Sequence, residues 1–275
     1  MDAALKLQTF ARRTCMERFD HWADIYSLMV RGDRDRDGPD YTDEAYAVFP
    51  RYNVAQTVLD HIETLDADAL PDCEQLRTLL VHLARNATSD RTRPMANPIQ
   101  QRAMADEREV LASLFMSVTA SELAQVKPLF YRRVLDARAV HQWREAIAAT
   151  WGAPDGYWYP LSEKTHASLV ALELDRVDDV QLQARIKKFF SANAVRRVIE
   201  LREYDESYEL DGAAAVLSYT GAEGFWTAPG NEWIVYCSHE GTITLGGAIA
   251  REIGPEYQVT QYDPSRSPHW LADSH

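Results

Sequence analysis

The chain has 275 residues, 46% of them hydrophobic and 26% charged, enough for one large domain or two smaller ones. No apolar run reaches the roughly eighteen residues of a membrane span, and the first residues lack the apolar core of a secretory signal, so we expect a cytoplasmic protein. The net charge of −13 argues against nucleic acid as a ligand and is compatible with a basic protein partner.

The first half of the chain has the apolar spacing of helices. Apolar side chains recur three and four residues apart through residues 3–31. Similar patterns follow at 42–65, 73–88, 98–118 and 129–150. Thr119 and Glu122 have the spacing of a capping box before a short turn. We therefore predict a helical domain over residues 1–150.

Between the first two predicted helices, residues 33–44 read DRDRDGPDYTDE and resemble an isolated EF-hand loop. Asp33, Asp35 and Asp37 occupy the first, third and fifth loop positions, and Glu44 the twelfth. Alternate carboxylates with a closing glutamate can surround one calcium ion. The resemblance covers these twelve residues and their flanks, and it implies a calcium site at these four residues.

The same segment also suits a solvated connector between two helices. Arg34 and Arg36 offset part of its negative charge, and Pro39 stiffens the position after the loop glycine. No second loop of this kind occurs in the chain, so a calcium site here would be unpaired. Both interpretations remain open from the sequence.

The pattern changes after Trp151, where glycines and prolines end the helical periodicity. Residues 167–174 and 195–201 have the composition of strands, and a helix beginning at Asp178 or Asp179 lies between them. Two more strands are expected at 232–238 and 242–246. The prediction is an α+β fold: the helical half is followed by a domain at 151–275 with a small mixed or antiparallel sheet and one or two helices.

Ser238, His239 and Glu240 stand side by side between those last two strands. Three consecutive strand residues alternate between faces, so they cannot form a nucleophile–base–orienter chain. Glu240-Gly241 is typical of a hairpin turn. His239 can still act in acid–base catalysis if folding brings it to a carboxylate, and Glu223 is the first candidate besides Glu240.

Aromatic residues in the second half are candidates for partner binding, because aromatics in glycine- and proline-rich loops often anchor recognition. Filling the core is the alternative role. The candidates are Tyr157, Trp158, Tyr159, Phe225, Trp226 and Trp233. An acidic stretch at residues 200–211 lies nearby in the sequence and is expected to be a solvated face.

Part of this half resembles known proteins. The string at residues 223–226, followed by those at 233–236 and 238–240, is similar to a pattern in uncharacterised bacterial cytosolic proteins. The acidic α+β half is also similar to bacterial immunity proteins that neutralise toxins. The resemblance covers at most the last 100 or so residues and implies a binding function without catalytic residues.

Three hypotheses follow for the function. The first is a binding protein of inhibitor, immunity or regulatory type that uses the acidic, aromatic C-terminal half. The second is a hydrolase-like enzyme using His239 with Glu223 or Glu240. The third is a calcium-responsive helix–loop–helix protein using the loop at residues 33–44.

Overall fold

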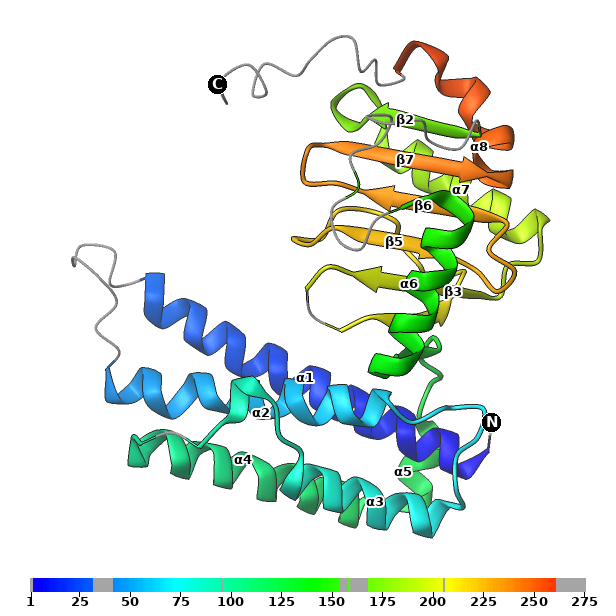
Figure 1. Cartoon of the computed structure of the whole chain (residues 1–275). Coiled ribbons are helices and arrows are strands. Elements are labelled where there is room, and N and C mark those ends of the chain that lie inside the picture. Colours follow the sequence, from blue (N-terminus) through cyan, green and yellow to red (C-terminus); the bar gives the residue numbers. More distant parts are fainter. Residues whose placement is uncertain are drawn as a thin grey trace. The chain divides into compact units, whose positions relative to one another are not determined.

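The computed structural model describes residues 2–31, 42–94, 96–153, 158, 168–204 and 206–260. The chain divides into a helical unit, Met1–Leu129, and a sheet unit, Phe130–His275 (Figure 1). The predicted α+β class is confirmed. No helix in the described part of the chain is both long enough and apolar enough to cross a membrane.

The helical unit has the helices that the apolar spacing predicted. They are α1 (Ala3–Arg31), α2 (Asp43–Glu63), α3 (Cys73–Asn86) and α4 (Pro98–Ser117), followed by the short α5 (Ala120–Gln125), with a 3-10 turn η1 (Asp90–Thr92) before α4. Their facing sides bury a core that includes Leu7, Ile62, Leu80, Leu111 and Phe115. Burial of these periodic apolar faces holds the helices together.

Side chains at the N-termini set where these helices begin. Thr42, Asp72 and Asn97 each accept hydrogen bonds from backbone N–H groups in the first turn of α2, α3 and α4. Thr119 and Glu122 form the predicted capping box at the start of α5. Each cap satisfies backbone donors that have no partner within the helix.

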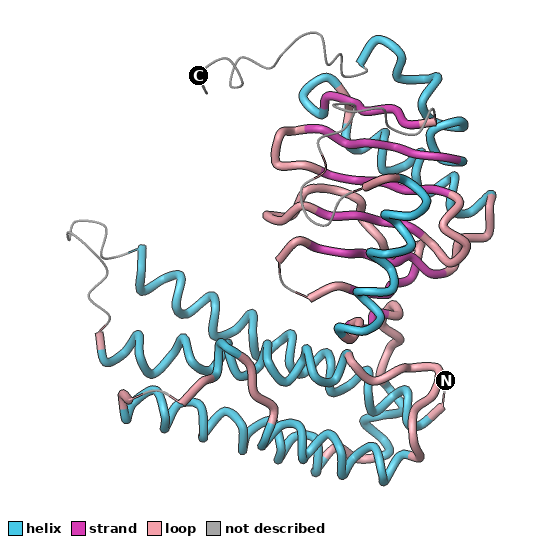
Figure 2. Tube along the Cα trace, viewed as in Figure 1, coloured by secondary structure: helices cyan, strands magenta, loops and turns pink. Residues whose placement is uncertain are grey.

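In the described part of the sheet unit, seven antiparallel strands form one sheet in the order β1-β4-β3-β5-β6-β7-β2. These strands are magenta in Figure 2. The strands are β1 (Arg132–Val134), β2 (Leu169–Glu173), β3 (Arg197–Arg202), β4 (Tyr208–Asp211), β5 (Gly224–Thr227), β6 (Trp233–Cys237) and β7 (Thr242–Gly247). The helices are α6 (Ala137–Trp151), α7 (Asp179–Ala192) and α8 (Ala248–Ile253), with 3-10 turns η2 (Leu174–Arg176) and η3 (Gly254–Thr260).

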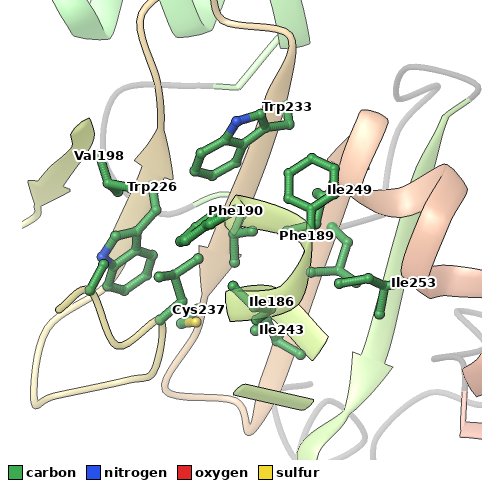
Figure 3. Packing of buried hydrophobic residues seen from close by; sticks show 14 of the residues in the cluster. Ile186, Phe189, Phe190, Val198, Trp226, Trp233, Cys237, Ile243, Ile249 and Ile253 are labelled. Carbon is green, nitrogen blue, oxygen red and sulfur yellow. The ribbon is translucent and has the colours of Figure 1, made fainter. Parts of the chain in front are cut away.

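Helices cover both faces of this sheet, with α6 on one face and α7 and α8 on the other (Figure 1). Every residue of β6 is therefore buried. Trp233, Val235 and Cys237 point into the core beneath α7 and α8, whereas Ile234 and Tyr236 point into the core beneath α6. In Figure 3, Trp233 lies close to two phenylalanines of α7.

The boundary between the two units lies between Leu129 and Phe130, whereas the sequence placed it at residue 150. The predicted helix at 129–150 is divided into β1 and α6, and both belong to the sheet unit. β1 pairs with β4, a strand more than seventy residues later that the apolar pattern did not predict. Local periodicity carries no information about such a pairing, so the sequence placed these residues with the preceding helices.

The predicted aromatic contact surface is wrong for the four candidates that the structure describes. Phe225 and Trp226 belong to β5, where a loop was expected, and both are buried. Trp158 and Trp233 are also buried. These rings fill the cores on the two sides of the sheet, so they cannot contact a partner. Tyr157 and Tyr159 lie outside the described residues.

Candidate functional site

A group of polar side chains gathers where β3 and β6 end and β5 begins. Gly224 of β5 pairs with Cys237 of β6, and this register places Glu223 opposite Ser238. The backbone N–H of Glu203, just after β3, bonds to the carbonyl of Glu223 at 2.9 Å. Three segments that are distant in the sequence therefore meet at one end of the sheet.

Glu223 is the buried centre of this group, with only 3% of its surface exposed. Its Oε2 accepts a hydrogen bond from the Tyr236 hydroxyl. Its Oε1 accepts the backbone N–H of His239 at 3.0 Å and faces the Nδ1 atom of the same residue. The Ser238 hydroxyl donates a longer bond of 3.5 Å to Oε1. A carboxylate removed from water is stabilised by such a set of donors.

His239 lies on the β6–β7 turn, between the carboxylates of Glu223 and Glu240. Its Nδ1 contacts Glu223, and its Nε2 is 3.1 Å from Oε1 of Glu240. The hydrogen bond to Glu223 raises the pKa of His239, and the negative charges of Glu223, Glu240 and Glu203 add to this effect. The imidazole is about half exposed, so the site opens to solvent on this side.

The predicted pairs of His239 with Glu223 and with Glu240 therefore both occur as contacts. The hairpin that carries His239 also forms as predicted, with β6 and β7 joined by a turn in which Gly241 has a φ of +69°.

A cluster of aromatic rings fixes the Tyr236 hydroxyl that reaches Glu223. The ring of Tyr236 lies 4.6 Å from that of Phe225 and 5.8 Å from that of Trp158, measured between ring centroids. The backbone N–H of Trp158 donates to the Tyr236 hydroxyl oxygen at 3.1 Å. Two of the predicted aromatic candidates, Phe225 and Trp158, thus support the site from beneath as packing side chains.

Two exposed tyrosines near Glu203 and Glu223 were not among the residues that the sequence suggested for a site. Tyr204 is 63% exposed and Tyr219 is 41% exposed. A hydrogen bond to Glu203 raises the pKa of the Tyr204 hydroxyl, and the charges of Tyr219 and Glu223 act in the same direction. Tyr204 stands inside the acidic stretch at 200–211, but only the pairing of β3 with β5 brings that stretch to the turn containing His239.

The acidic stretch at residues 200–211 was expected to be a solvated face, but part of it is buried. Glu200 lies on β3, and its side chain is only 15% exposed. Burial raises the pKa of Glu200, while the positive charges of Arg202 and Arg132 oppose the effect. The stretch therefore combines side chains held against the sheet, such as Glu200, with exposed side chains, such as Tyr204.

Three of the four predicted calcium ligands, Asp33, Asp35 and Asp37, lie outside the described residues. The fourth, Glu44, lies in the first turn of α2, where hydrogen bonds with its own backbone and with Thr42 lower its pKa. The described residues contain no group of three or more histidine, cysteine or acidic side chains placed to hold a metal ion. The calcium site remains a prediction.

The polar cluster can do two things chemically. It presents carboxylates and phenol groups to a cationic group of another molecule. It also presents a histidine oriented by a buried carboxylate, the arrangement of a general acid or base. Ser238 is not an available nucleophile, because it is 1% exposed and its hydroxyl binds Glu223 and the backbone N–H of Glu240.

Comparisons with models of protein families, with curated proteins and with solved structures gave no significant match to this chain.

Proposed function

We propose that this protein is a binding protein of inhibitor, immunity or regulatory type. Its contact region is the hairpin-end surface, defined as Glu203, Tyr204, Tyr219, His239 and Glu240. This surface replaces the buried aromatic residues that the sequence suggested. The proposed partner is a protein with a basic contact region.

The observation that carries this proposal is the exposed Tyr204, hydrogen-bonded to the Glu203 carboxylate, with a second exposed tyrosine, Tyr219, nearby. Tyrosine supplies large contact area with few rotatable bonds, and it is common at the centres of protein interfaces. Glu203 and Glu240 favour a positively charged partner, in keeping with the net charge of −13. Backbone N–H bonds to Glu223 hold Glu203 and His239 in place, which reduces the entropy lost on binding.

The test is affinity capture from a native lysate followed by native mass spectrometry. We expect the wild-type protein to retain a basic protein in fixed stoichiometry and to release it as the salt concentration rises. The double variant Tyr204→Ala/Tyr219→Ala should fold normally and lose at least tenfold in affinity for that protein.

Val180→Ala is the matched control, because Val180 is 79% exposed on α7 of the same unit and lies outside the surface. Equal capture by the wild type and the double variant would exclude the hairpin-end surface. A folded wild-type protein that captures no protein would count against the binding function itself.

A second proposal is acid–base catalysis by His239, as in a hydrolase, and one observation favours it. The contact from Nδ1 to the buried Glu223 is the way a catalytic histidine is oriented. Against it stands the Glu240 carboxylate on Nε2, the atom that a substrate would need. Hydrolysis of p-nitrophenyl acetate that is lost in His239→Gln would support this proposal. Equal rates in both proteins would reject it.

A further inference from the structure

The two ring nitrogens of His239 have no neutral arrangement that suits their surroundings. Nδ1 faces an oxygen of Glu223, and Nε2 faces an oxygen of Glu240. Ionised carboxylates only accept hydrogen bonds, so both nitrogens must carry a proton to satisfy both contacts. A neutral imidazole would direct one lone pair at a carboxylate.

We propose that His239 is a proton-controlled clasp that regulates the hairpin-end surface. In the protonated state it holds Glu240 and the β6–β7 turn against Glu223. When the proton leaves, Glu240 is released toward solvent and the surface loses the positive charge of His239, so a basic partner binds more tightly at higher pH. The effect on partner binding rests on the proposed function, whereas the clasp itself does not.

The surroundings of His239 all favour the charged ring except for its partial burial. Titratable groups face it from four segments: the start of β5, the turn itself, the end of β3 and strand β6. Glu223, Glu240 and Glu203 act on His239 directly. Tyr236 and Tyr204 act on Glu223, Tyr236 through a hydrogen bond and Tyr204 through its charge. Burial lowers the pKa of His239, but the contacts with carboxylates outweigh burial and the net direction is upward.

The clasp also links folding stability to pH. Since the pKa of His239 is higher in the folded than in the unfolded chain, its stabilising effect is complete below the unfolded value of about 6.5. The effect is lost as the pH rises through the higher folded value. The turn should therefore loosen on the alkaline side of neutrality and not on the acidic side.

The first experiment is an NMR titration of the His239 ring in the full chain without any partner. We expect a midpoint above the ordinary value of about 6.5. Glu240→Gln keeps the shape of the side chain and removes its charge, so it should lower the midpoint. Glu223→Gln should lower the midpoint further. If Glu223→Gln fails to fold, because Glu223 is buried, the Glu240→Gln variant alone decides the test.

A wild-type midpoint at or below about 6.5 would overturn the clasp. So would a midpoint that is unchanged in folded Glu240→Gln. His141→Gln is the control, because His141 contacts one carboxylate, Glu145, on an exposed part of α6. This control should leave the titration of His239 as it is in the wild type.

The second experiment measures regulation with a tetra-arginine peptide as the basic probe. The peptide should perturb the NMR signals of Tyr204 and Tyr219 at lower concentration at pH 8.5 than at pH 6, and this difference should vanish in His239→Gln. A raised midpoint with pH-independent peptide binding would leave the clasp in place and reject its control of binding. Absence of any perturbation would count against the proposed surface, while the titration still decides the clasp.

Discussion

Each of the two units contains a buried glutamate that accepts several hydrogen bonds. In each unit this one residue connects separate segments of the chain. Glu223 takes its donors from β6 and the following turn. In the helical unit, Glu107 of α4 is completely buried and receives both guanidinium arms of Arg18 at 2.7 and 2.6 Å. The indole N–H of Trp22 donates to it at 3.0 Å. These bonds connect α4 to α1.

We expect Glu107→Ala to lower the free energy of unfolding by about 2–4 kcal/mol, because it leaves the donors of Arg18 and Trp22 without their acceptor. Glu109→Ala on the same helix is the control. Glu109 pairs with Arg85 in an exposed position, so its loss should cost much less than the loss of Glu107. Urea unfolding of both variants measures the difference, and equal losses would contradict the role given to Glu107.

The sequence showed only some of the residues at the candidate site. His239 was predicted to lie in a hairpin turn, and Glu223 was its first candidate partner, because both flank short apolar segments. Tyr204 and Tyr219 were missed, since they come from segments without a strong local pattern. Phe225 and Trp226 were misassigned because aromatic residues that follow a glycine look the same in a loop and in a buried strand.

At the scale of elements, the passage from β7 into α8 depends on a glycine with no room for a side chain. Gly247 has a φ of +69°, and a Cβ atom there would lie 2.3 Å from the carbonyl oxygen of Glu232 and 2.6 Å from the ring of Trp151. The backbone N–H of Ala248 bonds to that same carbonyl at 3.2 Å. The start of α8 and the end of α6 therefore approach each other through this position.

Gly247→Ala should destabilise the protein by at least about 2 kcal/mol more than Gly241→Ala, because a crowded methyl group adds overpacking to backbone strain. Gly241 in the β6–β7 turn has the same φ of +69°, and a Cβ atom added there would meet nothing within 4 Å. Gly241→Ala should cost only the left-handed strain of about 1–2 kcal/mol. Thermal unfolding of the two variants measures this difference, and similar melting temperatures would refute the crowding.

At the scale of the whole molecule, the boundary at Leu129 and Phe130 decides which segments complete the sheet unit. α6 covers one face of the sheet, where Trp151 and Ile147 join the core with Ile234 and Tyr236. β1 pairs with β4. Without these two elements, that face and that strand would be exposed to solvent.

A fragment of residues 130–275 should therefore unfold cooperatively, whereas a fragment of residues 151–275 should not. The shorter fragment lacks β1 and all but the last residue of α6, which leaves the apolar face around Ile234 in water. Circular dichroism and dispersion of amide NMR signals distinguish the two outcomes. Cooperative unfolding of the shorter fragment would favour the boundary expected from the sequence.

The sequence by itself determined the elements whose apolar pattern is local. The four long helices of the first unit, the capping box at Thr119 and the β6–β7 hairpin follow from the spacing of apolar residues and from turn residues close to one another in the chain. These features need only neighbours within a few residues, so a single sequence contains the information.

Only the tertiary structure decided the strand order, the unit boundary and the members of the hairpin-end surface. Distant segments meet in the pairing of β1 with β4 and in the backbone hydrogen bond between Glu203 and Glu223. Which strands pair depends on how all the apolar faces of the unit are buried together. The apolar pattern of one segment does not indicate which other segment will pack against it. For the same reason, four of the aromatic residues that the sequence suggested as a contact surface are core residues of the sheet unit.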